Sequence, residues 1–149
     1  MRRLLLPLAA VLLLAACGGS SDGSLSHAEL VQRADAICAD AHTASAKVPP
    51  ATNVANAVPT LNKGLAIGRK ELADLRALKP SKEDAAGYAA VVAGLRTTID
   101  TTVRARDALK ANQRVRAQLL IQTALRSASQ TRATAAGFGL KVCSEDAAG

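Results

Sequence analysis

The side chains best suited to chemistry in this chain are three cysteines, Cys17, Cys38 and Cys143, and two histidines, His27 and His42. A cysteine thiol can be acylated, oxidised to a disulfide or bound to a metal ion. The histidines are fifteen residues apart in one expected helix. Their axial separation is then about 22 Å, so they cannot share a metal ion. The residue types therefore favour modification or pairing of the cysteines over a metal centre.

The N-terminus has the three regions of a secretory signal. Two arginines at positions 2 and 3 precede an apolar run, Leu4–Ala16, which is too short to span a bilayer as a permanent helix. Residues Leu14–Cys17 resemble the lipobox of bacterial lipoproteins, which signal peptidase II cleaves before the cysteine. The resemblance implies a signal peptide over residues 1–16 and a diacylglyceryl group on the Cys17 thiol. A chance cysteine beside an ordinary signal-peptidase site is the alternative.

Residues 17–25 are expected to form the lipidated cysteine and a short tether. The segment Gly18–Leu25 is rich in Gly and Ser, and a flexible coil of that length reaches roughly 15 Å. Two acyl chains would hold the protein firmly on a membrane. We therefore expect residues 26–149 to form the folded domain, attached through the lipid on Cys17 to the extracytoplasmic face of the cell membrane.

The composition favours helices. Of the 149 residues, 133 remain after the expected cleavage, which is enough for one domain with one core. The chain has one Phe, one Tyr and no Trp, so the core has to be built from Ala, Leu, Val and Ile. Half-buried strands usually carry aromatic and β-branched side chains, so this composition argues against a sheet. Without the first two arginines the chain has 17 basic and 12 acidic residues, a net charge of +5.

Two helices are predicted in the first half of the domain. Ser26 and Glu29 have the spacing of a capping box, and Pro49 stops the helix that begins there, at about residue 47. An apolar stripe predicts the second helix, ending near residue 78. Pro59 fits best in its first turn, but an earlier start near Asn53 with a kink at Pro59 stays open.

Two further helices complete the domain. Ser81 with the acidic residues after it predicts the start of a third helix, whose apolar stripe continues to about Lys110. Asn112 offers a break and a cap for a fourth helix, which Gly137 and Gly139 end. Four helices with short connections predict an all-α, up-down-up-down four-helix bundle. A three-helix assembly with a bent hairpin is the alternative.

Cys38 and Cys143 are most simply a disulfide if the domain lies outside the cytoplasm. The bond would close a loop of roughly 105 residues. A redox-active or metal-binding pair is the alternative, although the cysteines lack Cys-x-x-Cys spacing. Cys38 lies in the middle of the first helix and not at the end where the fourth helix is expected to finish. The segment Gly139–Cys143 therefore has to run about three turns along the first helix, or the fourth helix has to end at a level nearer to Cys38.

The mature chain also resembles the small alanine-rich lipoproteins of high-GC Gram-positive bacteria. The shared motifs are Ala-Asp-Ala-Ile-Cys at Ala34–Cys38, the Pro49-Pro50 break, and Gly-Phe-Gly-Leu-Lys-Val-Cys at Gly137–Cys143. That group is largely uncharacterised. The resemblance therefore implies a helical fold and a disulfide, and it implies no activity.

No residue pattern predicts catalysis. The chain has no Glu-x-x-His pair of the kind that holds a di-iron site, and no Gly-rich phosphate loop followed by Lys. We therefore expect a non-enzymatic protein with no catalytic residue, no metal and no cofactor.

A basic stretch surrounds the turn between the third and fourth helices. An ordinary solvated hairpin would have the same composition, and an anionic contact surface is the functional interpretation. Its partner would be an envelope protein or an anionic wall polymer, since the expected location and the lack of stacking aromatics argue against nucleic acid. The five residues of this basic hairpin are Arg104, Arg106, Lys110, Arg114 and Arg116.

Two functions follow from these patterns. The first is an interaction or structural module of the cell envelope. The second is a carrier that binds a small apolar ligand or lipid between helices, where Gly64, Gly68, Gly87 and Gly94 leave space. Small residues equally allow tight helix packing with no cavity, so the glycines alone do not decide between these functions.

Overall fold

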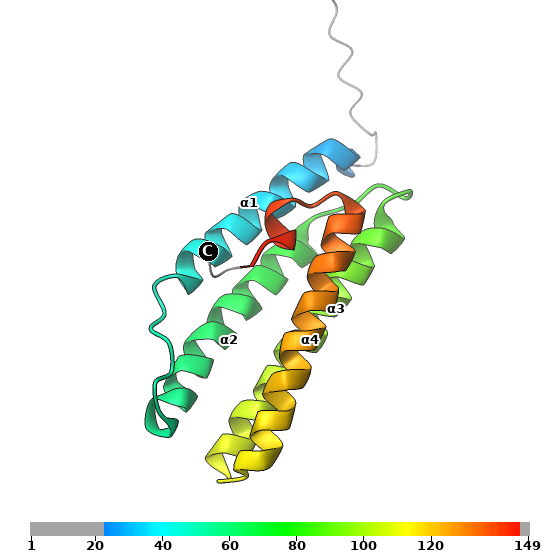
Figure 1. Ribbon diagram of the computed structural model, residues 1–149. Coiled ribbons are helices and arrows are strands. Elements are labelled where there is room, and N and C mark those ends of the chain that lie inside the picture. Colours follow the sequence, from blue (N-terminus) through cyan, green and yellow to red (C-terminus); the bar gives the residue numbers. More distant parts are fainter. Residues whose placement is uncertain (1–22, 147–149) are drawn as a thin grey trace, which may run out of the picture.

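This computed structural model describes residues 23–146, which form four long helices and one short 3₁₀ helix (Figure 1). The helices run alternately up and down, which confirms the predicted all-α four-helix bundle. The expected signal peptide and Cys17 lie outside the described residues. The elements are α1 His27–Ser45, α2 Val54–Ala77, α3 Ala85–Lys110, α4 Arg114–Phe138 and η1 Val142–Ser144.

The start of α1 is fixed by its own cap and by the chain before it. Ser26 Oγ accepts from the Glu29 N–H, and the Glu29 carboxylate accepts from the Ser26 N–H at 3.0 Å, so the predicted capping box is confirmed. The Leu25 N–H donates to the Lys79 carbonyl at 2.8 Å. This hydrogen bond joins the residue before the α1 cap to the connection between α2 and α3.

The start of α2 differs from the favoured prediction. Asn53 is the N-cap, with Asn53 and Asn56 side chains accepting from each other's backbone N–H, and Pro59 is the sixth residue of the helix. Placing Pro59 in the first turn was therefore wrong, and the earlier start that stayed open is the one observed. The reciprocal Asn cap offsets the single intrahelical hydrogen bond that Pro59 cannot donate.

The connection between α3 and α4 is made by Asn112, which has a φ of 56°. The N–H that follows it, from Gln113, donates to the Ala108 carbonyl at 2.9 Å. Asn112 thus ends α3 in the left-handed conformation, which confirms the predicted break. The N-cap of α4 is Gln113, so the predicted role of Asn112 as that cap was wrong. Gly139, with a φ of 101°, ends α4 in the same way, as predicted, whereas Gly137, the other glycine expected to end the helix, lies inside α4.

The core is concentrated in the half of the bundle that carries the N-terminus of the domain. There Tyr88 is buried and donates its hydroxyl to the Leu75 carbonyl at 2.9 Å, and burial raises the pKa of Tyr88 to about 12. The opposite half has a smaller cluster of three buried residues, Leu65, Leu72 and Ile99. The main cluster consists of Leu30, Ala34, Leu75, Tyr88, Val91, Ala135 and Leu140.

Helices α3 and α4 pack closely because two glycines of α3 face bulky groups of α4. A Cβ atom on Gly87 would lie 2.8 Å from the Phe138 ring, and one on Gly94 would lie 2.5 Å from Thr131 Oγ1. Phe138 and Thr131 fill the space that these glycines leave. The expectation that Gly87 and Gly94 make room for a ligand was therefore wrong.

The backbones of α1 and α4 are not adjacent, although the His27 ring of α1 lies against the Phe138 ring of α4, with ring centroids 5.2 Å apart. The C-terminal segment, residues 139–146, lies between them and contacts both (Figure 1). The four-helix arrangement is therefore closed on one side by irregular chain. This is the segment that carries Cys143.

Candidate functional site

Cys38 and Cys143 form a disulfide, with Cα atoms 5.2 Å apart, which confirms the predicted pairing. The C-terminal segment does climb along α1: Gly139 lies beside His27 and Cys143 reaches Cys38. The C-terminal segment therefore reaches Cys38 in the middle of α1, and α4 does not have to end at the level of Cys38.

The Asp35 carboxylate of α1 binds the backbone of the C-terminal segment. Its carboxylate accepts the N–H groups of Lys141 at 3.0 Å, Val142 at 2.9 Å and Cys143 at 3.2 Å. These donors belong to the first turn of η1, whose orphan N–H groups favour an acidic partner. The sequence analysis did not identify this role. The only signal is the place of Asp35 three residues before Cys38 on the same helix.

We predict that Asp35→Ala lowers the free energy of unfolding by about 2 kcal/mol, because three N–H groups lose a charged acceptor. Urea unfolding monitored by circular dichroism measures the change. Asp40→Ala, an exposed aspartate on the same helix, is the control and should change stability by less than about 0.5 kcal/mol. Equal effects of the two substitutions would show that Asp35 does not hold the C-terminal segment.

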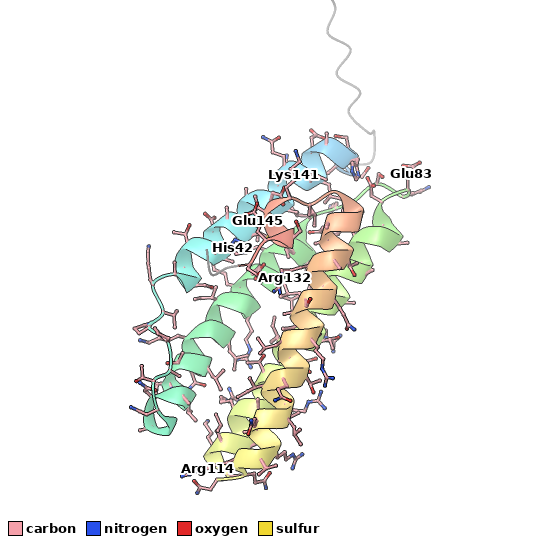
Figure 2. All side chains as sticks on the ribbon, viewed as in Figure 1. His42, Glu83, Arg114, Arg132, Lys141 and Glu145 are labelled. Atoms are coloured by element: carbon pink, nitrogen blue, oxygen red, sulfur yellow. A yellow bond between two sulfur atoms is a disulfide. The ribbon has the colours of Figure 1, made fainter. Side chains whose placement is uncertain are left out.

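A cavity of about 160 Å³, with ionisable side chains in its lining, lies beside the disulfide. His42 of α1, Arg132 of α4 and Glu145 of the C-terminal segment converge on it (Figure 2). Arg132 Nη2 is ion-paired with Asp146 Oδ1 at 2.9 Å. The fourth ionisable residue in its lining is Glu71 of α2. The cavity therefore gathers charged groups from distant parts of the sequence.

Glu71 is half-buried and has an unusual carboxyl group. Its Oε1 atom lies 3.5 Å from Cys38 Sγ, which carries no proton because Cys38 is disulfide-bonded. No other donor of the described residues lies within hydrogen-bond distance. Burial raises the pKa of Glu71 to about 7. Sequence reasoning missed Glu71, although it follows Gly68 by three residues and precedes Leu75 by four, which places it on the buried stripe.

The two histidines have separate environments at opposite ends of α1. His27 Nδ1 lies 2.8 Å from Asp84 Oδ1, which joins the starts of α1 and α3. His42 lines the cavity beside the disulfide. Within residues 23–146 no group of three or more His, Cys, Asp or Glu side chains could hold a metal ion. No helix in that range is long and apolar enough to cross a membrane.

The basic hairpin lies at the end of the bundle opposite the start of α1, where Figure 2 labels Arg114. Arg104 and Arg106 are two residues apart, so they lie on nearly opposite faces of α3. Arg106 is ion-paired with Asp107 and its side chain is only 17% exposed. Lys110 and Arg114 have no ion pair among the described residues. The five predicted residues thus share one end of the molecule but are divided between two faces.

Next to this hairpin, α2 faces α3 and α4 across an apolar groove. It consists of two adjoining cavities of about 450 and 170 Å³, which share Leu61, Thr98 and Thr102 in their linings. We call this feature the apolar groove. Its wall on α2 includes Gly64 and Gly68, and its wall on α4 includes Ile121 and Leu125. Two of the four glycines expected to leave space therefore do line a cavity.

Comparisons of the chain with protein-family models, curated proteins and solved structures found no match.

Proposed function

We propose that this chain is the precursor of a lipoprotein, anchored by a lipid on Cys17 at the extracytoplasmic face of the cell membrane, where it is a non-enzymatic binding module. The observation that carries the proposal is the lipobox-like Leu14–Cys17 at the end of a short apolar run. A folded domain begins with α1 only ten residues after Cys17. That spacing suits a domain tethered close to its anchor.

The disulfide supports the extracytoplasmic part of the proposal. Disulfides persist in oxidising compartments and are rare in the cytosol. The bond between Cys38 and Cys143 leaves Cys17 as the one remaining cysteine of the chain. A single unpaired cysteine directly after an export signal is the arrangement that lipidation requires.

The binding surface that we favour is the apolar groove. Ligand sites are commonly concave, largely apolar and between about 300 and 1,000 Å³ in volume. The larger cavity of the groove, at about 450 Å³, falls in that range. This observation favours a carrier of an apolar ligand. Contact of the basic hairpin with an anionic wall polymer is the second candidate, supported by the side chains of Lys110 and Arg114, which have no ion pair within residues 23–146.

We predict that cells grown with an alkyne-tagged palmitate label the wild-type protein covalently and that Cys17→Ala abolishes the label. The label must survive denaturation, which removes any fatty acid that is only bound. The matched control is the Cys38→Ala/Cys143→Ala double variant, which should still be labelled because its lipobox is intact. Labelling of the Cys17→Ala variant would refute the anchor at that residue.

A further inference from the structure

The exposed large apolar side chains of residues 23–146 all belong to α4. Val115 is 75% exposed, Leu119 59%, Leu125 65% and Ile121 37%. Single exposed apolar residues are common on protein surfaces, whereas a group of them marks an interaction site. These four lie within about three turns of one helix, and we call them the α4 patch.

The α4 patch lies on an open side of the bundle. The backbone of α4 is adjacent to α3 and to the C-terminal segment, and not to α1 or α2 (Figure 1). Val115 and Leu119 line neither cavity of the apolar groove. Ala133 follows Val115 by eighteen residues, which is five turns, so it continues the same outer face. Ala133 and Gly137 are small and exposed, so a flat surface can approach α4 along most of its length.

The charged side chains of α4 are all arginines. Arg132 is ion-paired with the C-terminal segment, whereas Arg114, Arg116 and Arg126 have no ion pair among the described residues. Arg126 follows Leu119 by seven residues, so both lie on the outer face. A dimer formed through two α4 patches would bring these like charges together without an acidic side chain of α4 between them. The α4 patch therefore favours an anionic partner over a second copy of the chain.

The tether is long enough to bring α4 to a membrane. The His27 ring at the start of α1 lies 5.2 Å from the Phe138 ring at the end of α4, so the tether joins the bundle beside that end of α4. Ser26 follows Cys17 by nine residues, and a chain of that length spans at most about 30 Å. A helix with its side chains is only about 10–12 Å wide. A lipid on Cys17 and the outer face of α4 can therefore contact the same bilayer.

We propose that α4 lies along the surface of an anionic bilayer, with the α4 patch among the lipid headgroups and Arg114, Arg116 and Arg126 bound to lipid phosphates. This inference rests on the lipid anchor proposed above and adds a second contact with the membrane. Arginine suits this contact because its apolar stem can lie beside the patch while its guanidinium group binds phosphate.

The anchor favours the bilayer over an acidic protein as the partner of the α4 patch. A short flexible tether gives two linked surfaces an effective concentration on the order of millimolar. At that concentration even weak binding keeps the surfaces together, so a small patch is sufficient. An acidic protein would have to bind the same patch from solution without this advantage.

A single tryptophan tests the contact, because the chain contains no Trp. Lipoprotein with the substitution Leu119→Trp is reconstituted in vesicles of phosphatidylcholine and phosphatidylglycerol, with or without bromine on the acyl chains, which quenches nearby tryptophan. We expect about twofold weaker emission in the brominated vesicles, because an interfacial helix buries its apolar face about 5–10 Å into the boundary of headgroups and acyl chains. Equal emission in the two kinds of vesicle would overturn the proposal, including blue-shifted emission from a tryptophan that a second copy or another protein covers.

Asn62→Trp is the matched control. Asn62 is exposed on α2, whose backbone is not adjacent to α4. Its tryptophan should emit equally in the two kinds of vesicle, as expected if the bundle lies with α4 on the bilayer. Equal quenching of the two variants would show that the domain has no preferred orientation, and would overturn the assignment of the contact to α4.

The role of the arginines is tested by adding Arg116→Gln and Arg126→Gln to the Leu119→Trp variant. This change, and separately the omission of phosphatidylglycerol, should each lower the quenched fraction about threefold, because basic side chains are attracted to anionic lipid. Quenching that neither change affects would overturn the binding of lipid phosphates by these residues.

The intact mass of each reconstituted sample distinguishes failure of the contact from failure of the anchor. Equal emission from protein with a lipidated Cys17 would overturn the contact of α4 and would not affect the anchor. An unmodified Cys17 would overturn both, since the contact of α4 depends on the tether.

Discussion

The Cys38→Ser/Cys143→Ser double variant is expected to unfold with a free energy about 3 to 5 kcal/mol lower than that of the wild type. The disulfide closes a loop with a sequence separation of 105 residues. Chain-entropy arguments give about 4.7 kcal/mol for a loop of roughly 100 residues, and native strain or residual denatured structure can reduce it. The bond also holds the C-terminal segment between α1 and α4, so its loss removes packing from the main core.

Urea unfolding of the oxidised wild type, the reduced wild type and the double variant measures this effect. The reduced wild type should match the double variant, because both lack the same covalent bond. A difference below about 1 kcal/mol between oxidised and reduced protein would contradict a stabilising role, since native disulfides of small secreted domains typically contribute 2 to 5 kcal/mol.

Glu71→Gln is expected to make the protein more stable at pH 8 and to flatten its pH dependence. The pKa of the Glu71 carboxyl is about 7 in the folded protein and about 4.5 in the unfolded chain. Between these values the folded state binds more protons, so the stability of the wild type falls as the pH rises from about 4.5 through 7. The loss is at most about 3 kcal/mol, because each pKa unit corresponds to about 1.4 kcal/mol.

The free energy of unfolding, measured at pH 5 and at pH 8, tests whether the Glu71 carboxyl group causes this pH dependence. The wild type should lose stability between the two conditions, and Glu71→Gln should lose less by about 1 to 3 kcal/mol. Glu83→Gln, at an exposed glutamate of the connection between α2 and α3, is the control and should follow the wild type (Figure 2). A Glu71→Gln variant with the pH dependence of the wild type would show that Glu71 is not the titrating group.

The features predicted correctly from the sequence depend on local chemistry. The capping box of Ser26 and Glu29 and the left-handed Gly139 each involve residues within a few positions of one another. The climb of the C-terminal segment is one of the two alternatives that the position of Cys38 in its helix leaves open, and the structure has that one. For the cap of α1 and the end of α4, the residue types and their spacing are sufficient to predict the local conformation.

Two helix starts show where local patterns compete. Asn112 can cap a helix start or end a helix in the left-handed conformation, and both roles suit its short amide side chain. Pro59 suits a first turn, but the pair Asn53 and Asn56 caps the helix five residues before it. The sequence contains both signals in each case, and only their relative strength decides.

The residues that were missed depend on long-range contacts. Asp35 binds backbone groups more than 100 positions away, and the carboxyl of Glu71 is buried by groups from several helices. The glycines illustrate the same limit, since Gly94 packs against Thr131 while Gly64 borders a groove. Periodicity identifies the face on which a residue lies, but the distance to the opposing helix depends on side chains elsewhere.

We propose that Cys17 is the lipidated first residue of the mature protein. The intact mass of the protein, purified from its native membrane under denaturing conditions, tests this. We expect a mass that begins at Cys17 and includes a diacylglyceryl group, with or without a further acyl chain on the amine. A mass that begins at any other residue, or one that carries an unmodified Cys17, would contradict lipidation at Cys17.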